Sequence, residues 1–198
     1  IVDEFQEYSP LHFELLKEIC LCNWIVLGDV NQSIFKNLDE TYLKKLSEFC
    51  NLGEVIYLTK SYRMTNQIAE FAGKVKDVGS KNFDRDGEKV EFVKSTELIK
   101  FLGNSKFESR AILCKDERSA NEFYSKLKNQ IDCTLNKFEN GKLLVASVNN
   151  VKGIEFEEVI VANLDDYDLK NELDKNILYN IVTRATNKLV LQSEKQNF

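Results

Sequence analysis

Residues 24–35 read Trp-Ile-Val-Leu-Gly-Asp-Val-Asn-Gln-Ser-Ile-Phe, a short apolar run that gives way at Gly28 to polar side chains. Such a run predicts a buried strand that ends at the glycine. Residues 1–7, Ile-Val-Asp-Glu-Phe-Gln-Glu, have the same form, so Asp3 and Glu4 follow a second strand end. Ligands of parallel sheets bind beyond the carboxyl ends of the strands. Both segments therefore predict polar groups of a ligand site.

Helical and extended patterns alternate along the rest of the chain. Apolar residues at helical spacing predict helices at 9–20, 39–50, 65–76, 95–103, 117–130 and 171–186. Short apolar runs predict further strands at 54–58, 90–93, 110–114, 143–147, 158–162 and 188–191, and the polar residues 77–89 predict a loop. This alternation predicts the α/β class, a parallel sheet with helices on both faces.

The composition narrows the class of protein. The 198 residues carry a net charge of −5, which argues against an autonomous nucleic-acid module held by its own basic surface. The five cysteines have scattered spacing, which predicts reduced thiols in a cytoplasmic protein. A thiolate metal site at Cys20 and Cys22 is a remote alternative, because zinc needs about four ligands. No apolar run is long enough for a membrane span and no signal peptide is present, so no membrane partner is expected.

Three of the polar residues after the first two strands have the chemistry of phosphoryl transfer. Asp3 can bind Mg²⁺, which neutralises phosphate oxygens, and Glu4 can accept a proton from an attacking water. Gln32 is a neutral donor and acceptor that can position a water or contact a terminal phosphate. Two solvated acids in a turn, and a Gly-Asp turn that simply ends a strand, are the plainer alternatives.

Further candidates lie in the second half of the pattern. Tyr62 offers a flat stacking face and Arg63 a planar fork for phosphate, although an arginine in solvent is the alternative. Gly153 permits a close backbone approach, and Glu155 can bond a ribose hydroxyl. Arg184 falls on an otherwise apolar face of the helix predicted at 171–186, where a charge is costly unless it is paired or functional.

In order and spacing these segments resemble motifs II to VI of the superfamily 1 helicases of the UvrD/Rep type. The family segments Asp-Glu-x-Gln-Asp and Gly-Asp-x-x-Gln-Ser-Ile-Tyr correspond to residues 3–7 and 28–35. Its Asn-Tyr-Arg-Ser, Lys-Gly-Leu-Glu-Phe and Tyr-Val-Ala-x-Thr-Arg-Ala segments correspond to residues 61–63, 152–156 and 179–185. The first two segments look closest to the HelD and helicase IV branch.

The resemblance implies a RecA-like fold of the P-loop NTPase helicases in truncated form. Residues 1–60 correspond to the C-terminal part of the first RecA-like domain, and residues 61–198 to the second domain. In the family ATP lies between two such domains and drives movement on single-stranded DNA. The chain has no Gly-x-x-x-x-Gly-Lys-Ser/Thr loop and begins without Met, directly in a motif. It is therefore expected to need an N-terminal half and to be inactive alone.

The resemblance also implies a role for each matching residue. Asp3 would hold Mg²⁺, Glu4 would activate the water and Gln32 would contact the γ-phosphate. Tyr62 would stack on adenine, and Gly153 and Glu155 would belong to the ATP-binding set, with Glu155 on the ribose. Arg63 and Arg184 would act as arginine fingers.

Two departures from the family pattern lie on its nucleic-acid side. An aromatic residue that stacks on bases is replaced by Asn37, which leaves Phe35 as the stacking candidate. The family's Thr-x-His is replaced by Ser-Val-Asn, so Asn149 is the corresponding contact. These changes keep a second hypothesis open: a HelD-like ATPase that remodels a protein partner such as RNA polymerase and unwinds little.

Overall fold

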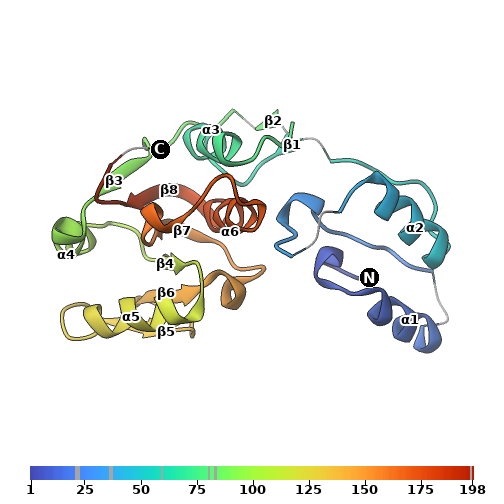
Figure 1. Cartoon of the computed structure of the whole chain (residues 1–198), viewed down its shortest axis with the longest axis horizontal. Helices are drawn as coiled ribbons and strands as arrows, with labels where there is room; N and C mark the ends of the chain where they lie inside the picture. Colours follow the sequence, from blue (N-terminus) through green and yellow to red (C-terminus); the bar gives the residue numbers. More distant parts are fainter. Residues whose placement is uncertain (21–22, 36–37, 59, 80, 83, 197) are drawn as a thin grey trace. The chain divides into compact units, whose positions relative to one another are not determined.

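The computed structural model describes residues 1–20, 23–35, 38–58, 60–79, 81–82, 84–196 and 198. The chain forms two compact units, Ile1–Leu58 and Thr59–Phe198 (Figure 1). Among the described helices, none combines the length and the apolarity needed to cross a bilayer.

The second unit is built on a six-stranded parallel sheet with the strand order β3-β8-β7-β4-β6-β5. Its strands are β3 (Glu91–Val93), β4 (Arg110–Cys114), β5 (Cys133–Leu135), β6 (Leu143–Ser147), β7 (Phe156–Val161) and β8 (Ala185–Gln192). The neighbouring strands β7, β4 and β6 are mostly apolar, as expected of strands that are covered on both faces.

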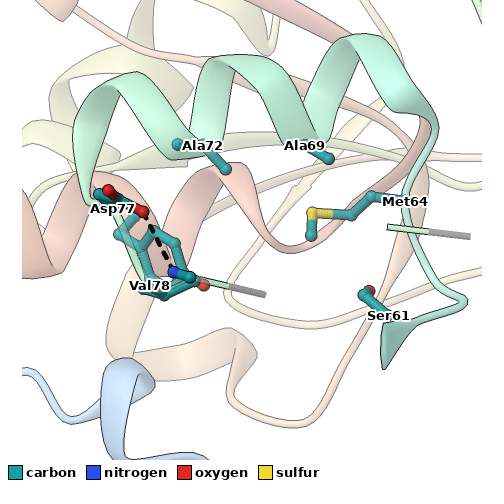
Figure 2. Close-up of a pocket in the computed structure, with 9 residues that line it drawn as sticks. Ser61, Met64, Ala69, Ala72, Asp77 and Val78 are labelled. Atoms are coloured by element: carbon teal, nitrogen blue, oxygen red, sulfur yellow. Dashed lines mark hydrogen bonds between the residues drawn. The ribbon is translucent and has the colours of Figure 1, made fainter. Parts of the chain in front are cut away.

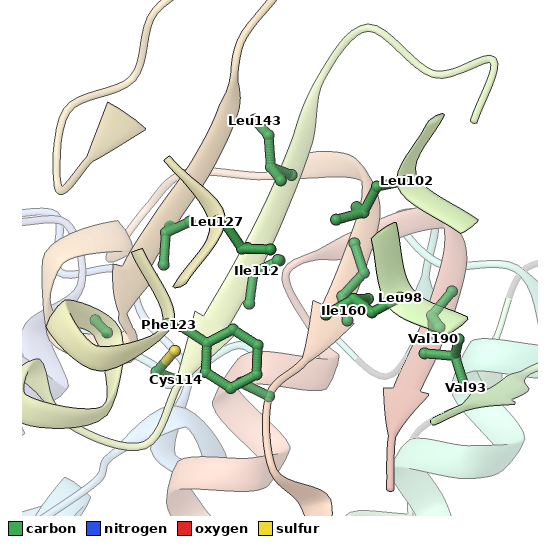
Figure 3. Close-up of a cluster of buried hydrophobic side chains, with 13 residues drawn as sticks. Val93, Leu98, Leu102, Ile112, Cys114, Phe123, Leu127, Leu143, Ile160 and Val190 are labelled. Carbon is green, nitrogen blue, oxygen red and sulfur yellow. The ribbon is translucent and has the colours of Figure 1, made fainter. Parts of the chain in front are cut away.

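Helices cover both faces of this sheet (Figure 1). On one face α4 (Ser95–Gly103) and α5 (Glu117–Leu127) pack on alternate strand residues, among them Ile112 and Ile160. Figure 3 shows this cluster, with Phe123 of α5 lying over the strands. On the other face α3 (Asn66–Val75) contacts α6 (Glu172–Val182) and β8, and α6 lies against β7 and β8. The predicted fold class, a parallel sheet with helices on both faces, is confirmed in this unit.

Short elements complete the second unit. The strands β1 (Lys60–Ser61) and β2 (Lys81–Asn82) pair in parallel, and the 3-10 turns η3 (Val148–Val151) and η4 (Leu164–Asp166) follow β6 and β7. The sequence pattern predicted neither β1, β2 nor β5, because two- and three-residue strands are too short to show a period.

The first unit is a small layer of two helices against two extended segments. It contains η1 (Phe5–Glu7), α1 (Pro10–Ile19), η2 (Val30–Gln32) and α2 (Glu40–Cys50). Its core consists of Phe5, Phe13, Leu46 and Cys50. The two extended segments meet in a single parallel bridge between Val2 and Val26.

Two predicted strands of the first unit are wrong or incomplete. Residues 54–58 form no strand and their side chains are exposed, because no described strand lies beside them to complete a hydrogen-bonded ladder. The predicted buried strand at 24–27 is reduced to the bridge at Val26, and Ile25 and Leu27 remain exposed. An apolar run indicates that a segment can be buried, but a strand also needs an adjacent strand with which to form hydrogen bonds.

Candidate functional site

The carboxylates of the first unit follow directly on the bridge. Val2 donates its N–H to the carbonyl of Ile25 and accepts from Leu27, both at 2.8 Å. Glu4 then turns the chain with a left-handed backbone (φ 54°), and its N–H donates to Asp3 Oδ1 at 2.9 Å. The expected pair of acids therefore directly follows the bridged residue Val2, with Asp3 exposed and Glu4 half-buried.

Gln6 joins the two polar segments. Its side-chain Nε2 donates to Glu4 Oε2, and its Oε1 accepts the N–H of Asp29 at 3.1 Å. A Cβ on Gly28 would lie only 2.3 Å from that Gln6 oxygen and 2.9 Å from the backbone nitrogen of Phe5. Glycine at position 28 thus allows the close approach that places the two segments side by side.

Gln32 belongs to the same network. Asp29 Oδ2 accepts from Gln32 Nε2 at 3.1 Å, and Asp29 Oδ1 accepts from the N–H of Asn31 at 2.9 Å. The side chain of Gln32 is mostly buried, so it is held in place by the protein. Phe35, the stacking candidate, is 70% exposed. Asn37 and Cys22 lie outside the described residues.

The donor set of the first unit fits Mg²⁺ in one mode. Mg²⁺ is commonly bound by one or two carboxylates together with waters and phosphate oxygens. Asp3 is exposed and offers such a carboxylate beside Glu4. In the described part of the chain no three His, Cys, Asp or Glu side chains are grouped to hold a metal ion by themselves.

In the second unit, Tyr62 and Arg63 follow β1. The ring of Tyr62 is 67% exposed, and Lys60 Nζ lies 5.6 Å from its centre. Arg63 Nε lies 2.5 Å from Glu155 Oε1, and both side chains are partly exposed. The structure thus brings together two candidates that are 92 residues apart in the sequence.

Arg184 lies close to this pair along the backbone. Glu155 precedes β7, and the N–H of the next residue, Phe156, donates to the carbonyl of Arg184 at 2.9 Å. Arg184 itself is buried, with 4% of its surface exposed. Segments around residues 63, 155 and 184 therefore converge at the amino ends of β7 and β8.

The expected position of Arg184 on a helix face is wrong. α6 ends at Val182, and Arg184 occupies the turn that leads into β8. The cause is the pairing of Ala185 with Phe156, which requires extended backbone from residue 185 onward. Continuing the helix to residue 186 would break that part of the β7–β8 ladder.

Gly153 and Asn149 lie in the connection between β6 and β7. Gly153 has φ +72°, a conformation that favours glycine. Asn149 is exposed in η3, just after the carboxyl end of β6. Glu155 stands before the amino end of β7, and the strands are parallel, so Asn149 and Glu155 lie at opposite ends of the sheet.

Three residues for which the sequence predicts no role organise these sites: Gln6, Asp29 and Arg85. Arg85 Nη2 donates to the carbonyl of Arg63 at 2.7 Å and also to the carbonyl of Thr186. Gln6 and Asp29 lie within the polar segments at 1–7 and 24–35, so their place in the sequence already indicated that they are near the site. Arg85 stands in a polar loop, where residue type alone gives no indication of a partner 101 residues away.

Two cavities of the second unit lie outside this set. A space of about 60 Å³ lies beneath α3. Met64 and Ala69 lie on its wall (Figure 2). It is far smaller than a nucleotide pocket, which needs several hundred Å³. A second cavity of about 310 Å³ is lined by Glu88, Glu158 and Lys188. There hydrogen bonds from Lys106 and Lys188 lower the pKa of Glu88 to about 2.

Comparisons with known proteins agree with the second unit's fold. Residues 142–192 match the family model of the UvrD-like helicase C-terminal domain. A solved C-terminal domain of a possible DNA helicase from Lactobacillus plantarum is 25% identical, with a TM-score of 0.54, covering 67% of this chain and 87% of that one. No curated protein sequence matches the chain.

Two viral helicases are similar over nearly the whole chain. The arterivirus nonstructural protein 10 helicase solved with DNA has a TM-score of 0.53 at 15% identity, and covers 98% of this chain. The PRRSV helicase has a TM-score of 0.51 at 12% identity, and covers 99% of this chain. The chain spans only 39% and 35% of these two proteins. At such identities the likeness concerns the fold alone, which is that of the RecA-like domains of helicases.

Proposed function

We propose that the chain supplies carboxylates and arginine fingers to an ATP-dependent helicase that moves on single-stranded DNA. The observation that carries this proposal is the convergence of Arg63, Glu155 and the Arg184 turn at one end of β7 and β8. Three segments that resemble separate helicase motifs meet there, although more than a hundred residues separate the first from the last.

The first unit provides the groups that act on water. Glu4 is the general base, and a positioned base of this kind contributes roughly 10²–10⁴-fold in rate. Gln32, held by Asp29, contacts the γ-phosphate. Asp3 holds Mg²⁺, which when bound neutralises charge on the phosphate oxygens.

The second unit provides the groups that stabilise the transition state. Arg63 and Arg184 neutralise the charge that develops on the transferring phosphoryl group. Arginine fingers contribute about 10³–10⁵-fold, equivalent to roughly 4–7 kcal/mol of barrier. Tyr62 stacks on the adenine, Glu155 bonds the ribose, and Gly153 gives the backbone the freedom to approach it.

Phe35 and Asn149 are the proposed contacts to DNA. Both are exposed. Stacking of a base on an aromatic ring such as Phe35 contributes about 1–3 kcal/mol. We propose residues 1–60 as part of a first RecA-like domain and residues 61–198 as a second, with the phosphate-binding loop supplied from outside residues 1–198.

The test is ATP hydrolysis by a protein that carries this chain together with a phosphate-binding loop. Single-stranded DNA should stimulate turnover, and the stimulation should weaken with salt because phosphate contacts release counterions. Arg63→Ala should lower kcat by at least 10³-fold. Turnover that is indifferent to both DNA and Arg63→Ala would refute the proposal.

A second candidate function is favoured by the charges at the carboxyl ends of β4 and β7. Asp116, Asp165 and Asp166 lie there, and Lys115 Nζ is bound to Asp174 at 2.7 Å. Acids at this edge repel nucleic-acid phosphates and suit a basic protein surface. The alternative is therefore a HelD-like ATPase that remodels a protein partner such as RNA polymerase. Stimulation of turnover by that partner, and not by DNA, would select it.

A further inference from the structure

We propose that Arg85 is a positioning residue for Arg63: it holds the backbone of Arg63 against the first residues of β8. The inference rests on the proposed function, since it takes Arg63 as a group that acts on phosphate. It assigns a role to a loop that resembles no motif.

The side chain of Arg85 bridges two distant parts of the second unit. Its Nη2 donates to the carbonyl of Arg63 at 2.7 Å and to the carbonyl of Thr186. Thr186 stands two residues after Arg184, and its own hydroxyl donates to the carbonyl of Phe156 at 3.2 Å. One guanidinium therefore joins the segments that carry Arg63, Arg184 and, through Phe156, Glu155.

The loop around Arg85 is itself seated on the first turn of α3. Asn66 Nδ2 donates to Asp84 Oδ1 at 2.9 Å and to Asp86 Oδ1 at 3.1 Å. The N–H of Asn66 donates to the carbonyl of Arg85 at 2.8 Å. The N–H of Gly87 donates to Gln67 Oε1 at 2.7 Å.

Gly87 allows this seating. A Cβ at position 87 would lie 2.4 Å from Thr65 Cγ2, so the loop approaches the start of α3 closely. Residues 84–87, which we call the clamp loop, thus contact Thr65, Asn66 and Gln67, which stand two to four residues after Arg63. Because only a few residues lie between these contacts and Arg63, the clamp loop fixes the backbone of Arg63.

The burial of Arg85 favours positioning over simple stabilisation. Its Nε is buried and has no hydrogen-bond partner among the residues that the structure describes. A buried donor left unsatisfied is unfavourable, and an apolar side chain of similar length would avoid it. What such a side chain would lose is the pair of bonds to the carbonyls of Arg63 and Thr186.

The experiment is a double-mutant cycle on ATP turnover in the loop-containing protein used above. Arg85→Met keeps the length and removes the donors. We expect kcat to fall about 10–100-fold with KM changed less than about threefold, because displacing a catalytic group by an ångström has effects of this size. Arg85→Lys retains a donor and should recover part of the loss. Arg118→Met, on an exposed arginine of α5 paired with Glu122, is the matched control and should leave kcat unchanged.

The cycle distinguishes positioning from general destabilisation. If Arg85 acts through Arg63, the variant Arg63→Ala/Arg85→Met should have the kcat of Arg63→Ala alone, within about twofold. Losses that multiply, or a wild-type kcat in Arg85→Met, overturn this inference while the proposed function stands. A wild-type kcat in Arg63→Ala overturns the proposed function and this inference with it. If Arg85→Met fails to fold, Arg85→Lys carries the same cycle, with a smaller loss expected in the single variant.

Discussion

Glu4 combines a left-handed backbone with a hydrogen bond from Gln6, so its carboxylate is held at the end of the first extended segment. Glu4→Gln keeps the size of the side chain and removes the base. In the loop-containing protein we expect kcat to fall roughly 10²–10⁴-fold, because a positioned general base contributes that much. Steady-state turnover measures it, and Glu14→Gln on the exposed face of α1 is the control. A variant that keeps wild-type turnover would remove Glu4 from the mechanism.

The ion pair of Arg63 and Glu155 implies that Glu155 and a bound triphosphate compete for the Arg63 guanidinium. A bound triphosphate and the Glu155 carboxylate both attract Arg63, so Glu155→Gln should tighten the binding of inorganic tripolyphosphate. The same variant should gain less affinity for ATP than for tripolyphosphate, because the neutral amide accepts the ribose hydroxyl less strongly than the Glu155 carboxylate. Competitive inhibition by tripolyphosphate gives the first constant and KM for ATP the second. Equal shifts of both constants in one direction would contradict this assignment.

The buried carboxyl group of Glu158 should make the stability of the protein depend on pH. Burial raises the pKa of Glu158, while the hydrogen bond from Ser105 and the charges of Arg110 and Lys188 oppose the rise. A carboxyl whose pKa is higher in the folded state loses stabilisation as pH rises from the ordinary carboxyl range through that higher value. Glu158→Gln should therefore gain stability relative to wild type as pH rises from about 5 to 8. Urea unfolding at several pH values measures the difference. Exposed Glu122→Gln should show no such trend, and a trend of opposite sign would refute the argument.

Gly28 governs how the two extended segments of the first unit meet. Gly28→Ala places a Cβ against the Gln6 side chain and the Phe5 backbone, so it should destabilise this unit by about 1–3 kcal/mol. Gly53→Ala is the matched control, because a Cβ there meets nothing within 4 Å. Denaturant unfolding followed by the fluorescence of Trp24, which packs on the core of this unit, reports the change. Equal midpoints for the two variants would show that the close approach is not required.

The helices and long strands were predictable because their signals are local. The helical spacing of apolar residues predicted α3, α4 and α5 within a few residues, and the runs at 110–114 and 143–147 match β4 and β6. The failures share a cause. Residues 54–58 have the composition of a strand but lack a neighbour, and Arg184 was assigned to a helix that the β7–β8 ladder ends early.

The site residues show the same division. The candidates around residues 3–7 and 28–35 could be named from the sequence, because each follows a recognisable strand end. The contacts between them could not, since the link through Gln6 depends on how two segments pack. Arg85 is the extreme case: its partners are 22 and 101 residues away, and no spacing rule connects them.

On their own, residues 1–198 should not hydrolyse ATP. The 198 residues contain no Gly-x-x-x-x-Gly-Lys-Ser/Thr segment to cradle the phosphates, so the carboxylates and arginines have no bound triphosphate on which to act. Phosphate release by the purified chain should equal that of Glu4→Gln. Turnover above background that Glu4→Gln abolishes would overturn this expectation.

The exposed apolar segment from Val55 to Leu58 affects how the purified chain behaves in solution. Ile56 and Leu58 are 80% and 91% exposed, and exposed apolar side chains on a segment that pairs with no described strand favour association between molecules. Concentrated solutions of the purified chain will scatter light and lose material with time. The double variant Ile56→Lys/Leu58→Lys should abolish this association and leave the melting temperature unchanged. Such a variant would be better suited to crystallisation.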